Sequence, residues 1–145
     1  MNYKGHLTGG IITSTLVAGG SLFLSGYDWV VAGVCWITTL IFSLYPDLDI
    51  SSKPSGYAYI MGIPMITALW YTEHSLEALL LALFITIPKV FPHRGLVHTL
   101  KFGVLASLCW IFILISFYGV SYYFIGVASM LGFTTHLILD KHIRI

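Results

Sequence analysis

Residues 29–49 decide the fold, and they read WVVAGVCWITTLIFSLYPDLD. The run up to residue 45 carries no charge, and Pro46-Asp47-Leu48-Asp49 ends it abruptly. Because proline cannot donate to the helical hydrogen-bond ladder, we expect Asp47 and Asp49 to lie in a turn that terminates a helix. An apolar helix of this kind is typical of a membrane span, and carboxylates at its end are candidates for function.

Outward from this stretch, the rest of the chain is equally apolar. The 145 residues are 57% hydrophobic and only 9% charged, whereas soluble domains average about 25% charged residues. A chain of this composition could not cover a water-facing surface. It therefore predicts an all-α integral membrane protein that forms a single domain over residues 1–145. The net charge of +1 and the lack of a basic tail indicate no nucleic-acid partner.

Turn and charge signals divide the chain into apolar stretches that predict a bundle of about six short transmembrane helices. The stretches are residues 7–24, 29–45, 57–71, 76–91, 102–117 and 122–139. Several are shorter than the ~20 residues that a bilayer core requires. Local thinning or oligomerisation accommodates short spans, so a homo-oligomer stays open. For the third stretch, which contains Gly62 and Pro64, a kink or a partly re-entrant path also stays open.

The basic residues assign the two sides of the membrane. With six crossings, both termini and the second and fourth loops share one face. That face receives every Lys and Arg of the chain, namely Lys4, Lys53, Lys89, Arg94, Lys101, Lys141 and Arg144. The opposite face receives Asp28, Glu73 and Glu77 and no basic residue. The positive-inside rule then places both termini in the cytoplasm.

Residues of metal-ligand type gather on the same cytoplasmic face. Four segments that are distant in the sequence deliver them to neighbouring helix ends: His6, Asp47, Asp49, His93, His98, His136 and Asp140. His136 and Asp140 are four residues apart, so they share one face of a helix. Any one of these residues alone is more often an interfacial or capping group, and only their joint placement predicts a site. Nitrogen and oxygen ligands without sulfur favour a divalent metal, with Zn²⁺ first and Mn²⁺ or Fe as alternatives.

Arg94 lies between two of the candidate ligands, in Pro92-His93-Arg94-Gly95-Leu96-Val97-His98. A guanidinium beside a metal cation would be repelled unless an anion lay between them. This arrangement favours a substrate with a phosphate group, which arginine binds with two parallel hydrogen bonds. The alternative is that Arg94 extends to the phosphates of the surrounding lipid.

At these residues the chain resembles the YdjM-like family of bacterial inner-membrane proteins, described as membrane-bound metal-dependent hydrolases. The matching segments are Gly5-His6, Pro46-Asp47-Leu48-Asp49, His93 to Thr99, and His136 to Asp140. That family looks distantly similar to zinc-dependent phospholipases C and single-strand nucleases. The resemblance implies a multi-pass inner-membrane protein that hydrolyses phosphoesters with two or three metal ions, and the residues alone are compatible with one to three. The soluble enzymes use further His and Glu ligands and the terminal amine, for which we find no match in this chain.

The residues and the resemblance together predict a membrane-bound hydrolase that cleaves a phosphoester of a phospholipid or lipid-linked substrate. Asp47 or Asp49 would be the base or a further ligand, and Arg94 would bind the substrate and stabilise developing charge. Three alternatives stay open: an ion or metal transporter, a b-type haem protein, and a protein in which metal merely ties helix ends together. The middles of the spans hold no Asp, Glu, Lys, Arg or His, which disfavours a transporter. The aspartates have no role in haem ligation.

Overall fold

The computed structural model describes residues 3–49, 53–91, 95–118 and 122–140, and these residues form helices without a β-strand. The α-helices are α1 (Tyr3–Leu24), α2 (Trp29–Leu44), α3 (Lys53–Tyr71), α4 (Ser75–Val90), α5 (Leu100–Tyr118) and α6 (Tyr122–Leu139). Two short 3₁₀ turns accompany them, η1 (Tyr45–Asp49) and η2 (Leu96–His98). The all-α prediction is confirmed, and each predicted apolar stretch coincides with one α-helix. α3 is continuous with Pro64 inside it, and its path relative to the membrane stays a prediction.

Length and hydropathy separate these helices by their ability to cross a membrane. Lys4–Leu24 and Trp29–Leu48 are long and apolar enough to cross by themselves. Leu100–Leu114 and Phe124–Leu139 are apolar but shorter. Crossing by all six helices therefore stays a prediction.

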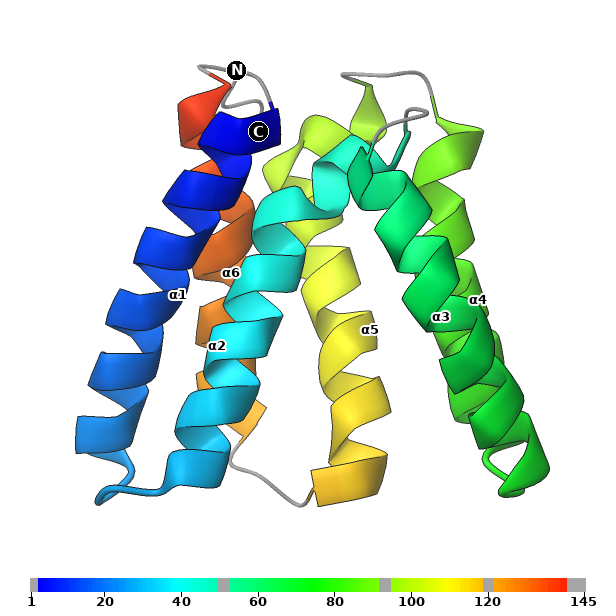
Figure 1. Ribbon diagram of the computed structural model, residues 1–145, viewed down its shortest axis with the longest axis horizontal. Coiled ribbons are helices and arrows are strands. Elements are labelled where there is room, and N and C mark those ends of the chain that lie inside the picture. Colours follow the sequence, from blue (N-terminus) through cyan, green and yellow to red (C-terminus); the bar gives the residue numbers. More distant parts are fainter. Residues whose placement is uncertain (1–2, 50–52, 92–94, 119–121, 141–145) are drawn as a thin grey trace.

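The helices run side by side, so that helix ends from distant parts of the sequence meet (Figure 1). α1 begins, α2 ends, α5 begins and α6 ends at one end of the bundle, which we call the site end. α1, α2 and α6 pack against one another, and α5 packs against α6. The α3–α4 hairpin diverges from α2 and α5 with distance from the site end (Figure 1). This arrangement brings the polar segments η1 and η2 together.

Local chemistry fixes the α1–α2 turn at the opposite end of the bundle. Asp28 Oδ1 accepts hydrogen bonds from the backbone N–H groups of Val30, at 2.9 Å, and Val31, at 3.2 Å, which caps the start of α2. Gly26 has φ of 70°, a left-handed conformation that glycine adopts without strain. The turn therefore reverses the chain and lets α1 and α2 pack antiparallel.

Glycine also sets how closely α6 approaches α2. A Cβ atom on Gly132 would collide with the backbone carbonyl oxygen of Thr39. On the neighbouring helix, a Cβ atom on Gly10 would collide with the Ser43 hydroxyl. Small residues allow backbones to approach in this way in membrane bundles. The close packing brings α1 and α6 against the end of α2, where the candidate ligands lie.

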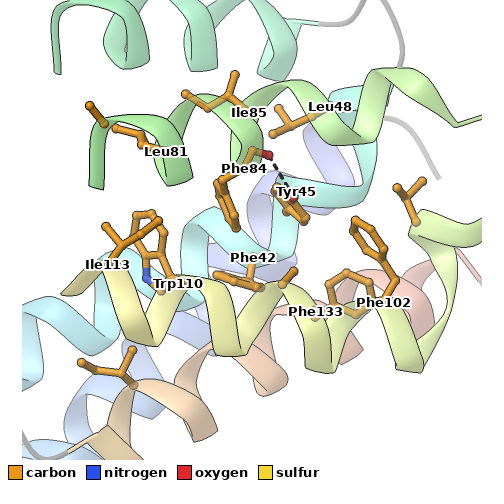
Figure 2. Close-up of a cluster of buried hydrophobic side chains, with 14 of the residues drawn as sticks. Phe42, Tyr45, Leu48, Leu81, Phe84, Ile85, Phe102, Trp110, Ile113 and Phe133 are labelled. Carbon is orange, nitrogen blue, oxygen red and sulfur yellow. Dashed lines mark hydrogen bonds between the residues drawn. The ribbon is translucent and has the colours of Figure 1, made fainter. Parts of the chain in front are cut away.

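An aromatic cluster anchors η1 to α4 and α5 (Figure 2). The ring of Tyr45 stacks on Phe84 with 4.2 Å between centroids, and Phe84 in turn lies 5.1 Å from Trp110. The Tyr45 hydroxyl donates a hydrogen bond of 2.9 Å to the Phe84 carbonyl oxygen. In an α-helix that carbonyl would accept from residue 88, but Pro88 has no N–H. Tyr45 therefore satisfies a carbonyl that proline leaves without its helical donor.

We expect Tyr45→Phe to destabilise the fold although it removes only one oxygen atom. The buried Phe84 carbonyl would lose its donor, and an unsatisfied buried group costs about 1–3 kcal/mol. Thermal unfolding of the purified protein in detergent measures the change. Tyr57→Phe is the control because Tyr57 is exposed and should leave the melting temperature unchanged. Equal melting temperatures for the two variants would show that the Tyr45 hydroxyl contributes nothing.

Candidate metal centre

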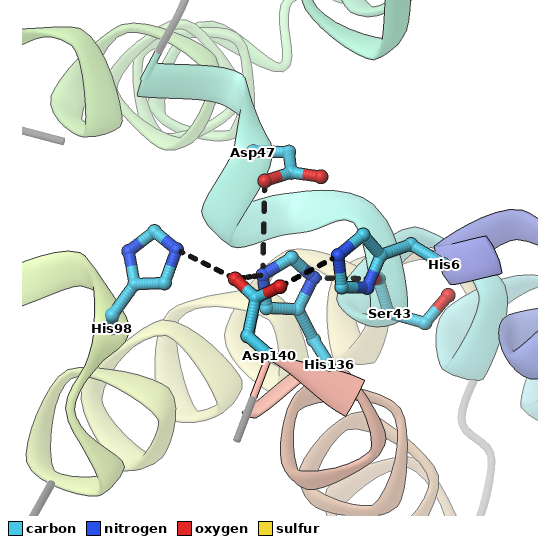
Figure 3. Close-up of polar contacts among 6 residues, drawn as sticks. All are labelled: His6, Ser43, Asp47, His98, His136 and Asp140. Carbon is cyan, nitrogen blue, oxygen red and sulfur yellow. Dashed lines mark hydrogen bonds and ion pairs between the residues drawn. The ribbon is translucent and has the colours of Figure 1, made fainter. Parts of the chain in front are cut away.

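Five ligand-type side chains converge at the site end, as Figure 3 shows. Their sources are the first turns of α1, the turn η1, the turn η2 and the end of α6, which supply His6, Asp47, His98, His136 and Asp140. The three histidines are between 0% and 1% exposed, and the side chains of Asp140 and Asp47 are 6% and 13% exposed. Buried charges need partners or a metal. The cluster is therefore a candidate metal centre.

His136 lies at the middle of the cluster, and a hydrogen bond at Nδ1 orients its ring. Its Nδ1 atom lies 2.9 Å from the backbone carbonyl oxygen of Ser43, which can only accept, so Nδ1 carries the proton. Nε2 then presents its lone pair to the other ligands, 3.6 Å from Asp140 Oδ2 and 3.7 Å from Asp47 Oδ1. A metal-ligating histidine is commonly oriented through its second nitrogen in this way.

Asp140 joins the histidines through both of its carboxylate oxygens. Oδ1 lies 3.0 Å from His6 Nε2, whereas Oδ2 lies 3.6 Å from His136 Nε2 and 3.9 Å from His98 Nε2. Burial raises the pKa of this carboxyl, but nearby groups, His136 and His6 among them, lower the pKa by more. Asp140 is therefore anionic at neutral pH and able to bind a cation.

The spacing of the donor atoms matches a coordination shell better than a hydrogen-bond network. Bonds of about 2.1 Å to a tetrahedral ion place ligand atoms roughly 3.4 Å apart. The donor atoms of His6, His136 and Asp140 lie within 4.8 Å of one another, as do those of Asp47, His98 and His136. Because His136 offers only Nε2, the two groups share one ligand atom. Their common centre is at His136.

Buried histidine nitrogens without hydrogen-bond partners indicate whether the cluster fits a metal. His6 Nδ1 and His136 Nε2 have no hydrogen-bond partner among the described residues. The ring of His6 stacks on His136 with 4.2 Å between centroids and 16° between planes. A buried polar atom without a partner is costly, and a divalent ion among the donor atoms would satisfy His136 Nε2, whereas His6 faces Asp140 with Nε2 (Figure 3). Three imidazoles with two carboxylates form a donor set that suits zinc.

The structure brings together most of the site that the sequence predicts. His6, Asp47, His98, His136 and Asp140 meet, and the shared helix face of His136 and Asp140 is confirmed. His93 and Arg94 lie outside the described residues, as does the side chain of Asp49. Their predicted roles as ligands, base and phosphate-binding group stay predictions.

One functional group escaped the sequence analysis, the backbone carbonyl of Ser43. A carbonyl belongs to every residue, so no residue type marks it. Its signal is its position in the last turn of α2, where carbonyl groups lack a partner within the helix. The end of α2 thus leaves a carbonyl for His136.

Comparison with known proteins places the chain in a family. The family model of the YdjM inner membrane protein matches residues 1–144. The chain belongs to the YdjM inner membrane protein family. No curated protein and no solved structure matches the chain. The predicted resemblance to this family is therefore confirmed, and so is the expectation of an inner membrane protein. The more distant similarity to phospholipases C stays a prediction.

Proposed function

We propose that this YdjM-family protein is a metal-dependent hydrolase that cleaves a phosphoester bond of a lipid substrate at the cytoplasmic face of the inner membrane. The observation that carries the proposal is the convergence of His6, His98, His136, Asp47 and Asp140 from four distant segments. Two histidine nitrogens within it lack hydrogen-bond partners among the described residues. Buried ionisable clusters are costly to a membrane protein and mark function.

We assign each residue of the site a role according to its position. His6, His98, His136 and Asp140 would hold one to three divalent ions, with zinc the first choice. A bound ion supplies Lewis acidity toward a phosphoryl oxygen and toward water. Asp47, whose side chain is the most exposed of the five, is the group that we assign to accept a proton from the attacking water. Arg94 remains the proposed contact for the phosphate.

The topology is part of the same proposal. Six crossings would place both termini and every Lys and Arg in the cytoplasm. The site end of the bundle would then face the cytoplasm, where lipid headgroups of the inner leaflet meet water. The phosphoester of a lipid headgroup at that depth would approach the metal centre laterally, from within the bilayer.

A second candidate function follows from the burial of the histidines. All three are 0–1% exposed, and closed metal sites are commonly structural. In this candidate the metal ties the ends of α1, α2 and α6 together without catalysis. The two functions agree on metal binding and differ on turnover.

The deciding experiment pairs metal counting with lipid hydrolysis. The purified protein in nanodiscs should contain stoichiometric metal by mass spectrometry and release a product from phosphatidic acid or from a phosphodiester lipid. Asp47→Asn should lower that rate by more than about 100-fold, the scale of losing general-base catalysis. Asp28→Asn is the matched control because asparagine also caps helices well and Asp28 lies at the opposite end of the bundle.

Each result of that experiment has a clear reading. Stoichiometric metal with no hydrolysis of any lipid phosphoester would favour the structural candidate over the hydrolase. A wild-type protein that holds no metal would contradict both. Equal rates for Asp47→Asn and Asp28→Asn would remove Asp47 from the chemistry.

A further inference from the structure

An apolar cavity of about 790 Å³ lies between the α2–α5 side of the bundle and the α3–α4 hairpin. Its walls come from α2, η1, α3, α4 and α5, and its floor includes the buried rings of Phe84 and Trp110 (Figure 2). The helix pairs diverge with distance from the site end (Figure 1). The cavity is therefore a groove between the two halves of the bundle, which we call the lipid groove for its proposed occupant.

The polar atoms in the walls of the lipid groove are mostly occupied already. The indole N–H of Trp110 donates to the Thr38 hydroxyl at 3.1 Å. The Thr72 hydroxyl donates to the Ala68 carbonyl at 3.0 Å, and the indole N–H of Trp36 donates to Thr15 at 3.4 Å. Few groups remain to fix a polar ligand. Hydrocarbon is the chemistry that fits these walls.

The volume of the groove is suited to an alkyl chain and is too small for a helix. Cavities that take small ligands measure about 300–1,000 Å³, and this one lies within that range. A membrane-spanning helix, about 10 Å across and 30 Å long, fills roughly 2,400 Å³, three times the volume available. Along α2 and η1 the groove runs from Val34 to Leu48, which at about 1.5 Å per residue is about 20 Å. That length spans one leaflet, whose hydrocarbon is about 15 Å deep.

The groove also reaches η1, the turn that carries Asp47. Leu48 lines its upper end and is the neighbour of Asp47, a member of the ligand cluster. Both residues lie on η1. A molecule whose chain filled the groove would thus have its polar head at the level of η1, the turn that also supplies Asp47 to the ligand cluster.

We propose that the lipid groove binds the alkyl chain of a phospholipid whose phosphate lies at the metal centre. This inference deepens the proposed function and rests on it for the position of the phosphate. It assigns the substrate class: a lipid recognised by one full-length chain. A water-soluble phosphoester would fill the centre and leave the groove without its occupant.

Fluorescence quenching at the floor of the groove tests the proposal. Trp29, Trp36 and Trp70 are replaced by Phe, so that Trp110, which is 7% exposed, is the one emitter left of the four tryptophans. The protein is placed in nanodiscs of dioleoyl phosphatidylcholine or of the same lipid brominated at mid-chain. Bromine quenches on contact, so a chain in the groove should remove most of the Trp110 emission.

A matched pair of variants separates the groove from the bulk bilayer. Ala68→Phe fills a lining position, whereas Thr67→Phe adds the same ring at an exposed neighbour that does not line the cavity. Ala68→Phe should restore most of the emission, and Thr67→Phe should not. Ala68→Leu is the milder second variant, and metal content confirms that each protein is folded.

The outcomes of this test are distinct from those of the hydrolysis assay. Emission that bromolipid leaves unchanged, or that Ala68→Phe and Thr67→Phe affect equally, overturns the groove proposal whether or not the protein hydrolyses lipids. Unquenched Trp110 in a protein that runs as a dimer would assign the groove to a second copy of the chain and also overturn it. Quenching that Ala68→Phe alone relieves supports the proposal, even in a protein without hydrolase activity.

Discussion

Replacing His136 with Ala is expected to abolish stoichiometric metal binding. His136 belongs to both groups of the candidate centre, so its loss removes a donor from each. Loss of an outer partner of a metal ligand already lowers affinity by about 10–100-fold. Loss of the shared ligand should therefore lower it by more than about 100-fold, measured by titration with Zn²⁺ and by metal content after dialysis.

The control for this variant is His74→Ala. His74 lies at the start of α4, with its side chain 42% exposed, 3.6 Å from Glu77. Its replacement should leave the metal content unchanged. If His136→Ala retained its metal, the centre would lie elsewhere in the chain.

Gly132→Ala is expected to have the largest effect on stability of the single-methyl changes considered. The added Cβ would collide with the Thr39 carbonyl oxygen, and a backbone atom cannot rotate away as a side chain can. α6 would have to separate from α2, which by the scale of overpacked cores costs about 3 kcal/mol. Unfolding in detergent measures the cost. Metal affinity should fall as well, because His136 lies one turn further along α6.

Gly33→Ala supplies a matched control on α2. Nothing lies within 4 Å of a Cβ atom at Gly33, so the substitution adds a methyl group to open space. Alanine is favoured over glycine in a helix by about 1 kcal/mol, and this gain applies equally to both variants. We therefore expect Gly132→Ala to lower the free energy of unfolding and Gly33→Ala to raise it. A destabilisation shared by both variants would contradict the close α2–α6 contact.

The helices could be predicted from the sequence because each one is an apolar run closed by a breaker. Asp28 and Pro46 bound α2 as expected. α3 begins earlier than its apolar stretch, at Lys53, because a polar first turn can be helical without being apolar. The membrane crossings are harder to predict, since several helices are shorter than a bilayer requires.

The convergence of ligands could be predicted because helix direction alternates along the chain. His6 and Asp140 are 134 residues apart yet lie 3.0 Å from each other, as their placement at ends on the same face implied. The support of His136 by the Ser43 carbonyl could not be predicted from residue type. Nor could the lipid groove, because it depends on how far the α3–α4 hairpin leans from α2 and α5, which no local pattern encodes.

The pairing of His6 with Asp140 has a consequence for biosynthesis. Asp140 follows His6 by 134 residues and is therefore synthesised well after it. While the ribosome is still extending the chain, the earlier histidines and Asp47 can be in the bilayer, but the centre lacks His136 and Asp140. Under the proposed function, metal uptake at this centre requires that translation has passed residue 140 and that α6 has docked. An unfinished or truncated chain cannot acquire the complete site.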